Sequence, residues 1–202
     1  ELVTYDYSHN GNRIGETEGG VKTDYLWDEF SQYGDVLLET NPTDIVSYTL
    51  ANGILISQTI NGTSDYFLQD ALNSTVALAD ETGIVGANDT FSYNAFGELQ
   101  NDPASETIGT KYLFTGQYFD HAITELYNLR ARQYDPTIGR FLTRDTWEYD
   151  FQNPFELNRY VYTANNPTTY TDPSGNFLEF SFLTSSQGSA TIKTGGTIGL
   201  IT

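Results

Sequence analysis

Short runs of alternating apolar and polar residues follow one another along the chain, and small turn residues separate them. Two apolar runs flank Asn52-Gly53, and a third run follows Asn61-Gly62. Asn-Gly between alternating runs is a strong hairpin signal, because both residues accept a positive φ. The pattern therefore predicts a three-stranded antiparallel meander over residues 45–68.

A longer unit recurs around this meander. In each copy, aromatic residues lead through Asp or Asn into a turn glycine, which a polar and then an apolar residue follow. Copies occur at residues 5–14, 91–99 and 134–141, and a looser copy spans residues 25–37. Each unit reads as a strand, a turn and the start of a return strand, and it cannot bury both of its faces alone. We expect successive units to form a continuing sheet in an all-β fold.

The composition agrees with an all-β fold and narrows the possible partners. The chain has 15 Tyr, 12 Phe and 18 Gly, residues typical of half-buried strands and tight turns. The net charge of −18 argues against a nucleic-acid partner, which needs a basic surface. There is no Cys, and two histidines cannot build a convincing zinc site, so we expect no metal and no cofactor.

Targeting and membrane signals are also missing from the sequence. It shows neither the charged and apolar pattern of a signal peptide nor an apolar span long enough for a membrane helix. We therefore expect no membrane insertion by this part. There is no Met, so we interpret the chain as a piece of a longer protein.

Residues 112–175 carry an ordered set of motifs: Tyr112–Gln117, Leu126–Tyr127, Arg130–Pro136, Gly139–Leu142, Asn158–Tyr162, Asn165–Pro167 and Asp172–Gly175. This set resembles the core segment of Rhs and YD-repeat proteins, a family that includes the C component of Tc toxins and the teneurins. Residues 69–76 resemble the segment that this family places upstream.

The resemblance implies an architecture and a location. Family members wind an antiparallel YD-repeat β-hairpin ribbon into a curled or spiralling sheet that forms a hollow shell. We accordingly expect a YD-repeat β-meander over residues 1–111, an Rhs core segment over 112–176 and a variable C-terminal β tail over 177–202. The implied role is that of a closing shell segment in a secreted or cell-surface protein.

The resemblance also implies a reaction. In toxin members the core segment cuts its own chain by aspartic-protease-like chemistry, in which one carboxylate activates water and a protonated one polarises the carbonyl. The matching residues are Asp145 and Asp172, with Arg144 as the adjacent cation and Asn176–Phe177 as the bond that is cut. The released partner would be the chain's own C-terminal effector.

Three features leave an alternative to cleavage open. Thr146 stands where the family usually has Pro, Asn176 stands where it often has Leu, and the chain continues to Thr202. In the alternative, Asp172 begins an Asp-Pro-Ser-Gly turn and Asp145 pairs with an arginine. Two further arginines, Arg130 and Arg132, are predicted to share one strand face and to pair with acids or stack on tyrosine.

Other functions remain open from the sequence. Residues 177–202 could donate a strand to a neighbouring subunit, which would make the chain part of an extracellular fibre or adhesin and possibly a homopolymer. A carbohydrate-binding surface module is a weaker alternative, which only the exposed aromatic residues suggest. Asn61, Asn73 and Asn88 lie in glycosylation sequons.

Overall fold

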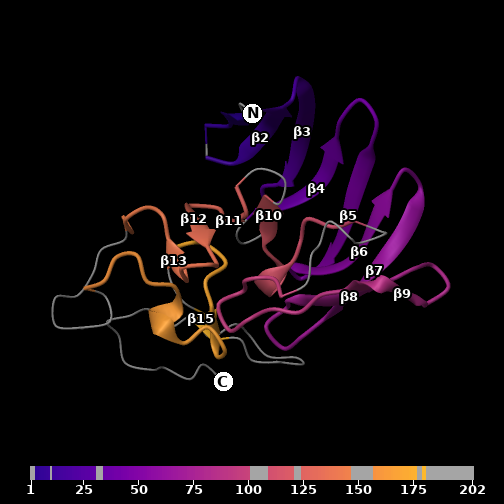
Figure 1. The fold of residues 1–202 in the computed structure, drawn as a ribbon. Helices are drawn as coiled ribbons and strands as arrows, with labels where there is room; N and C mark the ends of the chain where they lie inside the picture. The colour runs from indigo at the N-terminus through magenta and orange to yellow at the C-terminus, as the bar shows by residue number, and fades with distance from the viewer. Residues whose placement is uncertain are drawn as a thin grey trace. The chain divides into compact units, whose positions relative to one another are not determined.

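The computed structural model describes residues 3–9, 11–30, 34–100, 109–120, 124–146, 157–176 and 179–180. These residues form strands and turns with two short 3-10 helices, and no α-helix occurs among them (Figure 1). No helix in this described part is long and apolar enough to cross a membrane. The expected all-β antiparallel fold is confirmed.

The chain contributes to two compact units. The first, unit 1, takes its described residues from Glu1–Leu68, Thr75–Phe91 and Pro103–Gly109. The second, unit 2, takes them from Gln69–Ser74, Ser92–Asp102 and Thr110–Thr202. The chain therefore crosses between the two units several times.

Unit 1 is built on a nine-stranded antiparallel sheet in which the spatial order of the strands is their order in the chain. Figure 1 shows this order as a colour sequence from indigo to magenta. Within the described strands, β1 and β9 form the edges and do not pair with each other, so the sheet is open. The strands are β1 Val3–Tyr7, β2 Arg13–Glu18, β3 Val21–Asp28, β4 Asp35–Thr40, β5 Ile45–Ala51, β6 Ile54–Ile60, β7 Thr63–Gln69, β8 Thr75–Ala79 and β9 Val85–Thr90.

The predicted meander is confirmed as strands β5, β6 and β7. Asn52 and Gly53 have φ values of 53° and 75°, and Asn61 and Gly62 have values of 51° and 94°. A two-residue turn with both φ values positive matches the right-handed twist of the strands that it joins. The turn residues therefore fix the register of this part of the sheet.

Buried polar side chains of unit 1 form hydrogen bonds with one another and with the backbone. The Tyr25 hydroxyl donates to Glu16 at 3.3 Å, and the Tyr48 hydroxyl donates to Glu39 at 2.7 Å. Gln58, which is 1% exposed, donates from its amide nitrogen to the Gly109 carbonyl at 2.6 Å. Hydrogen bonds of this kind offset the cost of removing polar groups from water.

Several strands of unit 1 also carry exposed large apolar side chains. An accumulation of such residues on a sheet is a common feature of surfaces that other polypeptide covers. The exposed residues on strands β3 and β5 to β7 are Val21, Leu26, Ile45, Ile54, Ile56, Tyr66 and Leu68.

Unit 2 contains a four-stranded antiparallel sheet and a two-stranded one. Its described strands are fewer and shorter than those of unit 1. The four strands are β10 Tyr118–Asp120, β11 Leu126–Leu129, β12 Arg132–Asp135 and β13 Arg140–Phe141. The two-stranded sheet pairs β14, Tyr170–Thr171, with β15, Glu179–Phe180. The 3-10 helices of this unit are Phe114–Gly116 and Thr163–Asn165.

An aromatic cluster forms the core of unit 2. Tyr134 lies at its centre, with its ring centroid 4.3 Å from that of Tyr162 and 5.7 Å from that of Phe141. Two hydroxyls are held by carbonyls from an earlier part of the chain: Tyr127 donates to Gly97 at 3.0 Å and Tyr134 donates to Phe96 at 2.7 Å. Buried tyrosines need such partners, and these bonds tie the chain around residue 96 to the core segment.

Candidate functional site

The turn between β11 and β12 carries the first arginine of the site. Leu129 pairs with Arg132, so Arg130 and Ala131 form a two-residue turn. Arg130 adopts a φ of 56°, and its backbone nitrogen donates to the Asn128 side chain at 2.9 Å. The prediction that Arg130 and Arg132 share a strand face is therefore wrong, because Arg130 lies in the turn and only Arg132 belongs to β12.

This turn holds the Asp-Pro-Ser-Gly turn of residues 172–175, which we call the DPSG turn. Three consecutive residues, Arg130–Arg132, donate hydrogen bonds to three consecutive carbonyls of the DPSG turn. The bonds run from Arg130 Nη1 to Pro173 O at 2.5 Å, from Ala131 N to Ser174 O at 3.3 Å, and from Arg132 Nε to Gly175 O.

Arg132 brings the two predicted aspartates together. Its Nη2 lies 3.0 Å from Asp145 Oδ2 and 3.4 Å from Asp172 Oδ2. The side chain is 5% exposed, and its guanidinium carbon lies 3.6 Å from the centroid of the Phe141 ring. Burial lowers the pKa of the Arg132 guanidinium, while Asp145 and Asp172 act to raise it. An arginine stays protonated under such conditions, so Arg132 is a fixed positive charge between two carboxyls.

Asp145 is placed by a second arginine. Its backbone nitrogen donates to the Arg159 carbonyl at 3.0 Å, and Arg159 Nη2 donates to the Asp145 carbonyl at 2.6 Å. Arg132 Nη1 also donates to the Arg159 carbonyl, at 3.2 Å. These bonds fix the backbone of the Asp145 loop, so the Asp145 side chain faces Arg132 from a defined position.

Asp172 is placed by the DPSG turn itself. It is 4% exposed, and its Oδ1 accepts hydrogen bonds from Asn176 N at 3.1 Å and Ser174 Oγ at 3.3 Å. Gly175 has a φ of 70°, and a Cβ at this position would collide with the Leu129 carbonyl oxygen. Glycine is therefore required for the turn to sit against β11.

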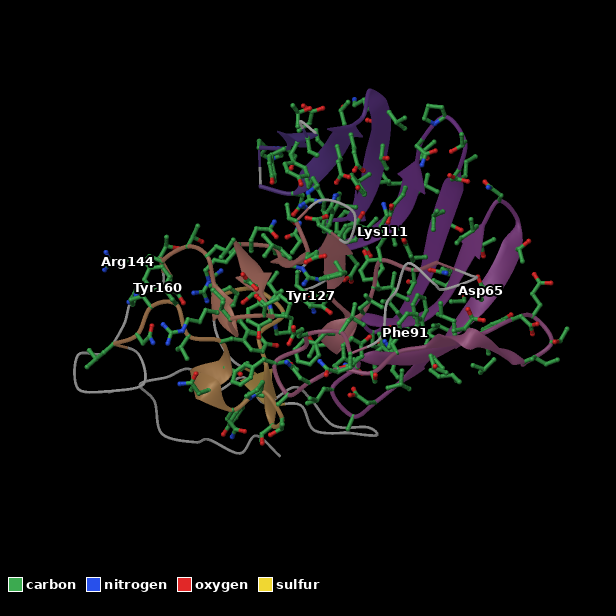
Figure 2. The ribbon with its side chains drawn as sticks, in the orientation of Figure 1. Asp65, Phe91, Lys111, Tyr127, Arg144 and Tyr160 are labelled. Atoms are coloured by element: carbon green, nitrogen blue, oxygen red, sulfur yellow. The ribbon has the colours of Figure 1, made fainter. Side chains whose placement is uncertain are left out.

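The structure places Arg144 away from this centre. The Arg144 side chain is exposed and, within the described ranges, no ion pair joins it to Asp145 or Asp172. Figure 2 shows Arg144 at the periphery of unit 2, away from the core residue Tyr127. Asn176 is half-buried, and Phe177 lies outside the described residues.

Arg132 therefore occupies the position that the sequence interpretation gave to Arg144. The sequence interpretation linked Arg132 to acids in general but did not connect it with Asp145 and Asp172. The available signal was the match of Arg130–Pro136 to a family motif, together with the rarity of arginine outside residues 112–175.

The predicted glycosylation residues lie in different environments. Asn61 and Asn73 are exposed, and the side chain of Asn88 lies outside the described set. The Asn61 side chain accepts a bond from Ile45 N at 3.0 Å and donates to Asp44 at 2.9 Å.

Across the part of the chain that the structure describes, no group of three or more His, Asp or Glu side chains is placed to hold a metal ion.

Sequence comparison places these features among known proteins. The family model described as teneurin YD-shell matches residues 2–168. The chain is 34% identical over 181 residues to the tRNA3(Ser)-specific nuclease WapA of Bacillus spizizenii, with 88% of this chain and 8% of that protein covered. It is 35% identical over 108 residues to salivary gland surface protein 1 of Aedes aegypti, which covers 54% of this chain and 3% of that protein.

Solved structures show a similar fold. The crystal structure of TcdB2-TccC3-Cdc42 matches with a TM-score of 0.60 and 20% identity over 86% of this chain and 9% of that one. A structure of the Photorhabdus luminescens Tc holotoxin pore matches with a TM-score of 0.52 and 21% identity over 90% of this chain and 9% of that one. The chain thus spans less than a tenth of the proteins that it resembles.

Proposed function

This chain belongs to the teneurin YD-shell family, and from this premise we propose that it is a closing segment of a secreted or cell-surface shell. In the whole protein its nine strands would be one stretch of a curled β-hairpin ribbon. The open edges of the sheet support this role, since an unpaired strand edge is a place where a further strand can add. The exposed apolar residues on β3 and β5 to β7 would face polypeptide in the complete protein.

The charge of the chain supports a shell role over the nuclease role in the name of its Bacillus relative. A net charge of −18 repels tRNA, whose phosphates require a basic surface. We therefore propose that this segment binds another polypeptide, either a C-terminal effector of the same chain or a partner subunit.

We further propose that the segment cuts its own chain after Asn176, the residue that follows the DPSG turn. The observation that carries this proposal is that Asp145 and Asp172 both contact one nitrogen of Arg132, at 3.0 and 3.4 Å. Asp145 and Asp172, which lie 27 positions apart in the sequence, therefore both contact the buried Arg132 side chain. Asp172 also accepts a hydrogen bond from the backbone nitrogen of Asn176. Two carboxyls that share one small site are the arrangement that activates water for peptide hydrolysis.

The test is the mass of the intact chain after purification and incubation. We expect two fragments that result from a break after Asn176 in the wild type, and a single uncut chain in Asp145→Asn and Asp172→Asn. Asp135→Asn is the matched control, because Asp135 also precedes a proline and caps a turn through Thr137 but forms no ion pair with Arg132 within the described residues. An uncut wild-type chain would remove the cleavage proposal and leave the shell role.

The fibre alternative has less support. The chain that follows the DPSG turn returns to its own sheet, where Thr171 pairs with Glu179 and Tyr170 with Phe180. This pairing uses β15 within the molecule, whereas strand donation would place it on a neighbour. Size-exclusion chromatography at several concentrations tests this alternative, and we expect an elution volume that does not change with concentration.

A further inference from the structure

Two hairpin turns of unit 1 carry the same dipeptide in different surroundings. Asn52-Gly53 joins β5 to β6, and Asn61-Gly62 joins β6 to β7. Each is a two-residue turn between directly paired strands, and all four residues are exposed. A third Asn-Gly pair begins at Asn10, which lies outside the described residues. The first two turns therefore form a matched pair within one sheet.

The Asn61 side chain is held at both ends of its amide. Its Oδ1 accepts a hydrogen bond from Ile45 N at 3.0 Å, and its Nδ2 donates to Asp44 Oδ1 at 2.9 Å. The backbone nitrogen of Asn61 also donates to the Ile45 carbonyl, at 3.0 Å. The amide group therefore faces the start of β5 and cannot turn toward its own backbone without breaking both side-chain hydrogen bonds.

The Asn52 side chain is not held in this way. Among the described residues it forms no hydrogen bond. The pairing of β5 with β6 also shifts register between Thr49 and Leu50, whereas the pairing of β6 with β7 runs without a shift. Only a short paired stretch thus lies between this irregularity and the turn, and exposed tips of this kind open locally at low free energy.

We propose that Asn52 is a site of spontaneous deamidation and that Asn61 is protected from it. The backbone nitrogen of Gly53 attacks Cγ of Asn52 and closes a cyclic imide, while the side-chain nitrogen leaves as ammonia with the proton that the peptide nitrogen gives up. Glycine suits the attacking position because no side chain shields its nitrogen. Water then opens the ring at either carbonyl, so one water is consumed and one ammonia is released.

The two products of ring opening affect the hairpin differently. Opening at one carbonyl leaves aspartate, and because Asp-Gly is also favoured in this type of turn, the hairpin persists with one more negative charge. Opening at the other carbonyl leaves isoaspartate, which takes the backbone through the side-chain carbon. A longer backbone no longer fits a two-residue turn, so the pairing of Ala51 with Ile54 is lost. The modification is independent of the shell and cleavage roles proposed above.

Timed incubation of the full chain in mildly alkaline buffer tests the proposal. Chymotrypsin cleaves after Leu55 and so places Asn52 and Asn61 in different peptides, in which mass spectrometry measures the conversion of asparagine to aspartate and isoaspartate. We expect Asn52 to react at least about tenfold faster than Asn61, the factor that corresponds to one hydrogen bond of ordinary net strength. Equal rates, a faster Asn61, or no reaction at Asn52 would overturn the proposal.

The same incubation in concentrated urea shows whether the fold causes the difference. Both asparagines precede glycine, so in the unfolded chain we expect them to react at similar rates. A difference in urea as large as that in buffer would assign the selectivity to the neighbouring sequence and overturn the structural explanation.

Substitution of Asp44 tests the protection of Asn61. Asp44→Ala removes the acceptor of the Asn61 amide nitrogen and should raise the rate at Asn61 about tenfold. Asp44→Asn is the matched control, because its side-chain carbonyl can still accept this bond and should keep Asn61 slow. Asn52 is the internal reference, since a variant that loosened the whole sheet would raise both rates. An unchanged rate at Asn61 in Asp44→Ala would overturn the protective role of this contact.

Discussion

At the scale of single residues, Gly175 shows most directly how the backbone sets the site. Its φ of 70° and the Leu129 carbonyl oxygen, which occupies the space that a Cβ would need, are two separate reasons for glycine. Gly175→Ala should therefore destabilise the chain by more than the roughly 1–3 kcal/mol that a strained backbone alone costs. Urea unfolding curves measure this difference.

The matched control for Gly175 lies in unit 1. Gly53 has a φ of 75° but no atom within 4 Å of a Cβ position, so Gly53→Ala adds backbone strain without a clash. We expect Gly175→Ala to be the more destabilising of the two. Equal losses would show that the DPSG turn can move away from β11.

The Asp65 carboxyl makes stability depend on pH. Asp65 is 5% exposed, and burial, opposed by Gln58 and aided by Asp89, raises the pKa of its carboxyl. The folded state then binds the proton more tightly than the unfolded state, so the contribution of Asp65 is favourable at low pH and is lost as the pH rises through the raised pKa. Asp65→Asn should therefore stabilise the chain at pH 7 and have little effect in acid, which thermal melts at the two pH values measure.

A half-buried aspartate, Asp80, provides the control of opposite sign. Thr82 and the backbone N–H of Ile84 hold the pKa of the Asp80 carboxyl below its usual value. Its stabilising contribution is present at neutral pH and is lost as the pH falls through the lowered pKa. Asp80→Asn should thus lower the melting temperature at pH 7, and a gain there would contradict the assignment.

At the scale of elements, the core of unit 2 contains a pair of tyrosines for comparison. The Tyr134 hydroxyl donates to Phe96 O at 2.7 Å, and Tyr134→Phe leaves that carbonyl without its donor. The expected loss is about 1–3 kcal/mol, the usual cost of a buried polar group without a partner. Thermal or urea unfolding measures it.

Tyr162 should respond differently. Burial raises the pKa of its hydroxyl, and although Thr115 and Asp172 lie close, the hydroxyl forms no hydrogen bond of normal geometry within the described ranges. Tyr162→Phe removes a buried polar group that is already poorly paired, so the change in stability should be near zero or favourable. A loss as large as that of Tyr134→Phe would reveal a partner for this hydroxyl.

These elements also show how much the sequence could predict. The β5–β7 meander was predictable because its signals are local. Each Asn-Gly pair ends one strand and forms a turn whose positive φ values match the twist of the two strands that it joins. The pairing of Arg132 with Asp145 and Asp172 was not, since its partners lie 13 and 40 positions away. Arg144, adjacent to Asp145, was the natural local choice, yet adjacent strand or loop residues point in different directions.

At the scale of the whole molecule, the two units share the chain in alternating pieces. Unit 2 includes Ser74, whose Oγ accepts a bond from Thr115 N at 3.1 Å, and Phe96 and Gly97, whose carbonyls hold two core tyrosines. A fragment of residues 110–202 lacks these partners, so we expect it to show weak near-ultraviolet circular dichroism and no cooperative melting. A sharp transition like that of the full chain would contradict this expectation.

The strand order of the nine-stranded sheet affects how the protein can be made. Every strand pairs only with the strand before and after it in the chain, so contact order within the sheet is low and folding needs few long loop closures. Strands can add one at a time as the polypeptide leaves a ribosome or an export channel, before the remainder has arrived. A gene can likewise gain or lose two strands at once and keep the direction of every later strand, which gives such sheets a simple route to new lengths.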